Sequence, residues 1–80
     1  MHLTIYAMRL RPTTPLREVE YFLNLLFHVY IVIDDVEEEK EMKEDILENA
    51  KTFTELGLYG RLTFSIEYGT IEIKEDGLII

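Results

Sequence analysis

The chain has 80 residues and a formal net charge of −8, and it contains no cysteine. This length predicts a single domain over residues 1–80, and the lack of cysteine excludes disulfides and thiolate metal sites. The excess of carboxylates argues against direct binding to nucleic acid, because phosphates are bound mainly by Lys and Arg.

The first predicted elements are a strand over residues 2–10 and a helix that begins at Pro15 and ends near Phe27. The strand alternates, with Leu3, Ile5 and Ala7 on one face. Thr14 is expected to cap the helix, and Pro15 suits the first helical position. The apolar residues of this helix cover a much wider arc than one packing face requires. The helix is therefore expected to be sandwiched within the domain or shared between subunits.

The segment from His28 to Ile33 is rich in β-branched and aromatic residues and is apolar at successive positions. This pattern is typical of a central strand that is buried on both faces. Asp34 and Asp35 are expected to end the strand.

A second helix is predicted from Val36 to Leu56. Asp35 fits its N-cap, Glu38 lies three residues further on, and Gly57 follows its end. The side expected to be buried consists of Met42, Ile46, Ala50, Phe53 and Leu56.

This second helix carries most of the negative charge of the chain. Residues 34–55 hold ten carboxylates against three lysines, a local balance of −7. At 100° per residue, the carboxylates gather on the side opposite the apolar residues. The members of this arc are Glu37, Glu41, Glu44, Asp45, Glu48 and Glu55.

The last third of the chain predicts a hairpin. Residues 61–67 and 70–75 alternate between apolar and polar, and Tyr68-Gly69 fits a two-residue turn between them. Asp76-Gly77 is a second turn signal, after which residues 78–80 could add a short strand.

The predicted order is therefore β-α-β-α-β-β, an α+β protein folded as a two-layer α/β sandwich. A strand–helix–strand unit favours a right-handed crossover with its two strands parallel, which gives a mixed sheet with both helices on one face. Hydrophobic residues make up 48% of the chain, a high share for a small monomer. We therefore expect a homodimer, formed by the uncovered face of the sheet or by the spare side of the first helix.

Two groups of residues could carry catalysis. Asp34 and Asp35 could hold Mg²⁺ for phosphoryl transfer, although Asp35 also fits a helix cap. His28 could act as a general base beside Asn24 and Arg17, which share its side of the first helix. No catalytic motif and no cofactor motif accompanies either group, and an enzyme is not expected.

The only basic cluster predicted comprises Arg9, Arg11 and Arg17, around the first loop. These arginines could meet the acidic helix of a second copy or a phosphate-bearing ligand, or they could simply be solvated. Without an aromatic platform they are a weak indication of nucleic-acid binding.

No signal peptide is recognisable, and the longest near-continuous apolar run, residues 21–33, is shorter than the roughly 20 residues that a spanning helix needs. We therefore expect an intracellular, cytoplasmic protein with no membrane partner.

Glutamine and tryptophan are absent and serine occurs once, a composition that follows the trend of hyperthermophile proteins. In size, acidity and lack of cysteine, the chain resembles small proteins of viruses and mobile elements that infect thermophilic archaea. That compositional resemblance implies an inhibitor of a host defence complex.

The expected function is that of a non-enzymatic interaction protein. Its acidic helix would dock onto a basic protein partner and imitate nucleic-acid phosphates, and complementary charge would speed and orient the encounter. The residues expected to bind the partner are Glu37, Glu41, Glu44, Asp45 and Glu48. The alternatives are a small metal-dependent nuclease or other phosphoryl-transfer enzyme using Asp34 and Asp35, and a structural subunit of a larger assembly.

Overall fold

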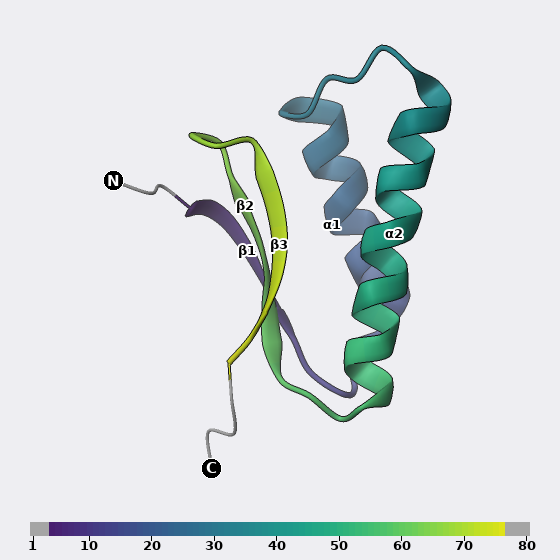
Figure 1. Cartoon of the computed structure of the whole chain (residues 1–80). Helices are drawn as coiled ribbons and strands as arrows, with labels where there is room; N and C mark the ends of the chain where they lie inside the picture. The colour runs from purple at the N-terminus through teal and green to yellow at the C-terminus, as the bar shows by residue number, and fades with distance from the viewer. Residues whose placement is uncertain (1–3, 77–80) are drawn as a thin grey trace.

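Two helices lie against one face of a three-stranded sheet in the computed structural model, which describes residues 4–76 (Figure 1). The elements in chain order are β1 (Thr4–Leu10), α1 (Leu16–Val29), α2 (Val36–Glu55), β2 (Gly60–Ser65) and β3 (Thr70–Glu75). The predicted α+β class is confirmed, but the order is β-α-α-β-β. The predicted last strand, residues 78–80, lies outside the described residues.

The strand predicted from His28 to Ile33 is wrong. His28 and Val29 complete α1, and residues 30–35 connect the two helices. The backbone N–H groups of Tyr30 and Ile31 both donate to the carbonyl oxygen of Leu26, at 2.8 and 3.0 Å, and so close the end of the helix. Leu26 and Phe27 are buried by the helical arrangement. A short apolar run looks the same in a buried strand and at a helix end, so tertiary packing decided between them.

The loss of this strand also changes the sheet from mixed to antiparallel. Two antiparallel helices return the chain to the end of the sheet where it left, so β2 runs opposite to β1 (Figure 1). The predicted parallel pair needed a single helix between residues 2–10 and a strand at residues 28–33, and that strand is absent from the described residues. The sheet order is β1-β2-β3, with both neighbouring pairs antiparallel.

Both ends of α2 are closed by hydrogen bonds between residues that are near each other in the sequence. The carboxylate of Asp35 accepts the backbone N–H groups of Glu37 and Glu38, which confirms the predicted cap of α2. Gly57 adopts a φ of 72° after α2, and the N–H of Leu58 donates to the carbonyl of Phe53 at 3.1 Å, as in a Schellman motif.

The predicted cap of α1 is wrong. Pro15 occupies the N-cap position, and its side chain makes no capping bond. The Thr14 hydroxyl instead accepts the backbone N–H of Arg11 at 2.8 Å, while the Thr14 N–H donates to the Arg11 carbonyl at 2.9 Å. Thr14 therefore closes the turn before the helix, and the helix begins at Leu16.

The core lies between the sheet and the two helices. Leu10, Val19, Leu23, Ala50 and Leu62 form a fully buried cluster. On α2 the buried side is rotated from the predicted one, since Leu47 packs against the cluster while Met42 and Leu56 are exposed. The rotation follows from α2 packing against α1 as well as against the sheet.

Cross-strand register decides which face of the sheet is covered. Met8 lies opposite Leu62, and Leu62 opposite Ile73, so these residues line the covered face. The register shifts between Thr4 and Tyr6, and Ala7 lies on the uncovered face of the sheet. The predicted two-residue turn between β2 and β3 is a four-residue loop over residues 66–69, in which Gly69 has a φ of 62°.

Within residues 4–76, neither helix has the length and apolar content needed to cross a membrane.

Candidate protein-binding surface

The carboxylates predicted to bind a partner lie together on the outer side of α2. We call this set the acidic face; its members are Glu37, Glu41, Glu44, Asp45 and Glu48. All five side chains are exposed, and within the described part of the chain none takes part in an ion pair. The structure therefore brings the five predicted residues onto one accessible surface.

No lysine of α2 forms an ion pair with this face among residues 4–76, although Lys51 lines a depression with Glu44, Asp45 and Glu48. Lys43 points toward α1, where its ammonium group lies 3.9 Å from a carboxylate oxygen of Glu39 and 5.2 Å from the centre of the Phe27 ring. A cation over an aromatic face is attracted by the ring quadrupole. Lys43 thus neutralises a carboxylate beside α1 instead of one on the acidic face.

The acidic face has a linear charge density close to that of a nucleic-acid strand. Glu48 lies eleven positions after Glu37, which is about 16 Å along the helix axis. Five charges over that length amount to roughly one per 3–4 Å, against about one per 3.4 Å along a single strand of duplex DNA. The face therefore offers a basic groove a similar number of negative charges per unit length.

This charge arrangement destabilises the isolated helix slightly. Glu41 has a like charge four residues away on each side, at Glu37 and Asp45, and Glu44 faces Glu48 in the same way. Such pairs cost about 0.2–0.5 kcal/mol each. Glu37 also lies in the first turn, where the helix dipole favours negative charge. The net cost is about 1 kcal/mol or less, which a folded domain tolerates.

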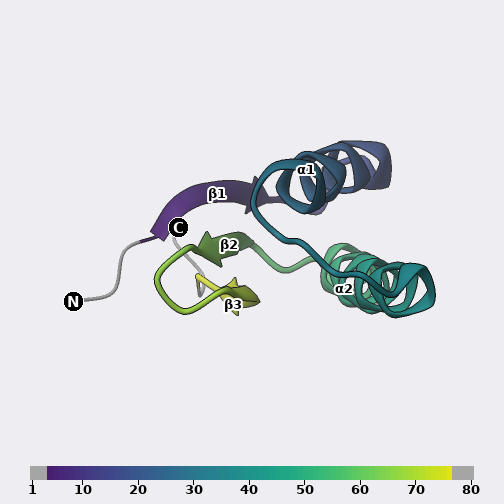
Figure 2. The ribbon, with the colours of Figure 1, turned by 90° about the horizontal axis from the view of Figure 1, so that it is seen from above.

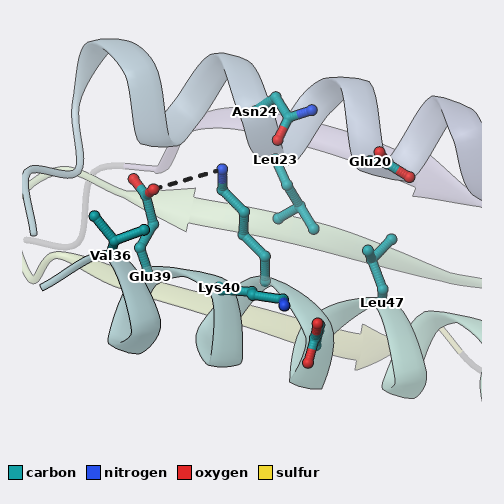
Figure 3. A pocket seen from close by; sticks show the side chains of 9 residues that line it. Glu20, Leu23, Asn24, Val36, Glu39, Lys40 and Leu47 are labelled. Carbon is teal, nitrogen blue, oxygen red and sulfur yellow. Dashed lines mark ion pairs between the residues drawn. The ribbon is translucent and has the colours of Figure 1, made fainter.

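A groove of about 310 Å³ lies between α1 and α2 (Figure 3). Leu23 and Leu47 contribute its apolar lining, while Glu20 and Asn24 of α1 contribute polar groups. The Glu39–Lys43 ion pair lies at one end of the groove (Figure 3). Glu44 lines the groove and also belongs to the acidic face, so a side chain of a docked partner could reach both.

Asp34 and Asp35, the metal ligands of the alternative hypothesis, have different roles in the structure. One carboxylate oxygen of Asp35 is 2.9 Å from the Glu37 amide and 3.3 Å from the Glu38 amide, so it is engaged in capping. Asp34 is exposed in the connection before it. Among residues 4–76, no three His, Cys, Asp or Glu side chains are grouped in a way that could hold a metal ion.

The second group considered for catalysis lies on the surface of α1. Arg17, Asn24 and His28 are all exposed, and Asn24 also lines the groove between α1 and α2. His28 and Asn24 border a shallow depression beside Ile33, which also includes Lys43. The structure thus keeps the three residues on one side of α1, as their spacing predicts.

Sequence reasoning missed a row of cations on the uncovered face of the sheet. Arg9 lies opposite Arg61 in the β1–β2 register, and Arg61 lies opposite Lys74 in the β2–β3 register. Arg61 donates from Nε to Asp76 at 2.9 Å, and Lys74 lies 3.5 Å from Glu72. The predicted cluster instead grouped Arg9 with Arg11 and Arg17. Only the strand register reveals the row, and no spacing in the sequence encodes it.

Comparisons of the chain with models of known protein families, with curated proteins and with solved structures found no match. The surface chemistry is therefore the basis for a functional proposal.

Proposed function

We propose that this chain is a non-enzymatic interaction protein whose acidic face docks onto a basic protein partner. The observation that carries the proposal is the exposure of five carboxylates on one side of α2 without a paired cation among residues 4–76. Complementary charge steers association and fixes the orientation of the partner.

The charge density of the acidic face supports a partner that normally holds nucleic acid. A groove that binds phosphates presents Lys and Arg along its length, and the acidic face offers carboxylates at a comparable spacing. With the compositional resemblance to small viral and mobile-element proteins of thermophilic archaea, we propose an inhibitor of a host defence complex, acting in the host cytoplasm.

The test compares three immobilised baits in lysate of a thermophilic archaeal host. The first is the wild type, and the second is the charge-reversed variant Glu41→Lys/Glu44→Lys/Glu48→Lys. The third is a control with three exposed carboxylates outside the acidic face reversed, Glu18→Lys/Glu72→Lys/Glu75→Lys. Each Glu→Lys replacement raises the formal net charge by two. Both variants therefore have a formal net charge of −2, compared with −8 for the wild type.

We expect the wild type and the control to capture the same basic protein and the acidic-face variant to lose it. Capture should weaken steeply with added salt, because exposed charges are screened. Duplex DNA or RNA should also release the captured protein by competing for its groove. Equal capture by the two charge-reversed baits, or capture that is indifferent to salt, would contradict the proposal.

A further inference from the structure

A stripe of apolar side chains is exposed along α1. Tyr21, Leu25 and Val29 are spaced four residues apart, and their exposed fractions are 67%, 46% and 56%. Residues at this spacing lie one above another on the same side of a helix. We call these three residues the α1 stripe.

The stripe faces away from the rest of the domain. Leu25 is two positions from the fully buried Leu23, so the two side chains point to nearly opposite sides of the helix. The side of α1 that meets α2 carries Glu20 and Asn24, which line the groove between the helices. Seen from above, α1 lies on the β1 side of the molecule and α2 on the β3 side (Figure 2). The stripe is therefore on the lateral side of α1 that α2 does not cover.

The spacing of the helices and of the strands determines which element a second copy would meet first on this side. Packed helix axes are about 8–10 Å apart, close to the roughly 10 Å between the outer strands of a three-stranded sheet. Helix α1 therefore sits over β1, and its radius carries its side chains beyond the edge of the sheet. Strands must come within about 4.8 Å of each other to pair. Two copies approaching at this side would meet through α1 before their β1 strands could hydrogen-bond.

Charge favours a second copy at this side over approach through α2. Helix α1 holds two carboxylates and one arginine, a balance of −1, whereas α2 holds eight carboxylates and three lysines, a balance of −5. Contact between the α1 helices keeps the two acidic faces at opposite ends of the assembly. Contact between α2 helices would oppose like charges, which is unfavourable.

The stripe also matches itself under a two-fold axis. In an antiparallel pair of α1 helices centred on Leu25, Leu25 meets its own counterpart and Tyr21 packs beside Val29 of the second copy. This is an isologous contact, in which the same surface is used by both subunits. A large side chain opposite a small one lets the two ridges interlock.

From these observations we propose that the protein forms a two-fold homodimer through the α1 stripe. The two-helix layers join into a layer of four helices, in the order α2, α1, α1, α2, and the β1 edges stay unpaired. The dimer presents two acidic faces pointing outward. This inference does not depend on the proposed partner, because it uses a different surface.

Sedimentation velocity tests the dimer on the full chain. The wild type should have the mass of two chains, and Leu25→Lys should raise the dimer dissociation constant on the order of 30-fold or more, as expected for a central interface residue. The matched control is Leu56→Lys, which places the same change on an exposed leucine at the other helix and should remain dimeric. Helical circular dichroism checks that each variant is folded, and Val29→Lys provides an independent disruption.

The lack of native cysteine allows a direct test of the helix pairing. Leu25→Cys should form an intermolecular disulfide readily in mild oxidant, and Leu56→Cys should not. In an equimolar mixture, Tyr21→Cys and Val29→Cys chains should crosslink to each other in preference to themselves. A monomeric wild type, a dimer that survives Leu25→Lys, or crosslinking of Leu56→Cys equal to that of Leu25→Cys would overturn the inference.

Discussion

The ring of Phe53 lies directly against the backbone of Gly60, where the chain leaves α2 and enters β2. A Cβ on residue 60 would come within 2.6 Å of Cε1 of Phe53 and would also collide with the carbonyl oxygen of Lys74 in β3. Gly60 is buried and lies opposite both Leu10 and Glu75 in the sheet. Glycine is therefore needed here for close approach, and this contact joins the end of α2 to the middle strand.

Gly60→Ala should be strongly destabilising. Because the backbone carbonyl of Lys74 cannot rotate away, either strand would have to shift, and overpacking of this kind costs about 1–3 kcal/mol. Chemical denaturation followed by circular dichroism measures the loss. Thr63→Ala, in the same strand on the uncovered face, should cost less than half as much. Equal stability of Gly60→Ala and the wild type would contradict the close packing.

Asp35→Ala should destabilise α2 by about 1 kcal/mol, since it removes the acceptor for the Glu37 and Glu38 amides. Asp35→Ser should retain most of the stability, because a hydroxyl can cap in the same way. Asp34→Ala is the neighbouring control and should change the free energy of unfolding by less than about 0.5 kcal/mol. Thermal denaturation of the three variants distinguishes a capping role for Asp35 from a general effect of lost charge.

The hydroxyl groups of Tyr6 and Tyr30 are hydrogen-bonded, and the two rings lie 4.9 Å apart. This bond, helped by partial burial of the ring and by repulsion from an ionised Tyr6, raises the pKa of Tyr30 above its usual value of 10.0. The folded state therefore favours neutral Tyr30. The resulting stability is fully present below pH 10 and is lost as the pH rises through the higher pKa of the folded state.

Tyr30→Phe should remove this part of the alkaline pH dependence of stability. The ultraviolet absorbance of tyrosinate, titrated in the wild type and in Tyr30→Phe, should show that the missing transition is the one at higher pH. Tyr6→Phe should move the Tyr30 transition back toward 10. If the tyrosinate transition at the highest pH is still present in Tyr30→Phe, it does not belong to Tyr30, and the hydrogen bond to Tyr6 does not control it.

Glu41→Gln should stabilise the protein while weakening its binding to the proposed partner. The change removes like-charge contacts with Glu37 and Asp45, worth about 0.4–1 kcal/mol together, and the gain should shrink as salt is added. Glu39→Gln should have the opposite sign, because Glu39 pairs with Lys43 in the first part of the helix. A stability loss in Glu41→Gln at low salt would show that Glu41 makes a favourable contact.

The acidic helix was predictable because everything that defines it is local. The Asp35 cap, the Gly57 end and the periodic carboxylates all act within a few residues of each other, and the structure confirms each of them. Residues 28–33 were not predictable on the same grounds. Their apolar pattern fits a buried strand as well as it fits a helix end followed by a connection. Tertiary packing decided the outcome, because the helical arrangement buries Leu26 and Phe27.

The sequence by itself determined the α+β class, the position of α2 and the exposure of its carboxylates, since helix capping and charge periodicity need no distant partner. Only the tertiary structure decided the antiparallel sheet, the row of Arg9, Arg61 and Lys74, and the uncovered stripe on α1. Each of these depends on which segments lie side by side. That choice is made by packing between residues far apart in the chain, because many pairings satisfy the same local pattern.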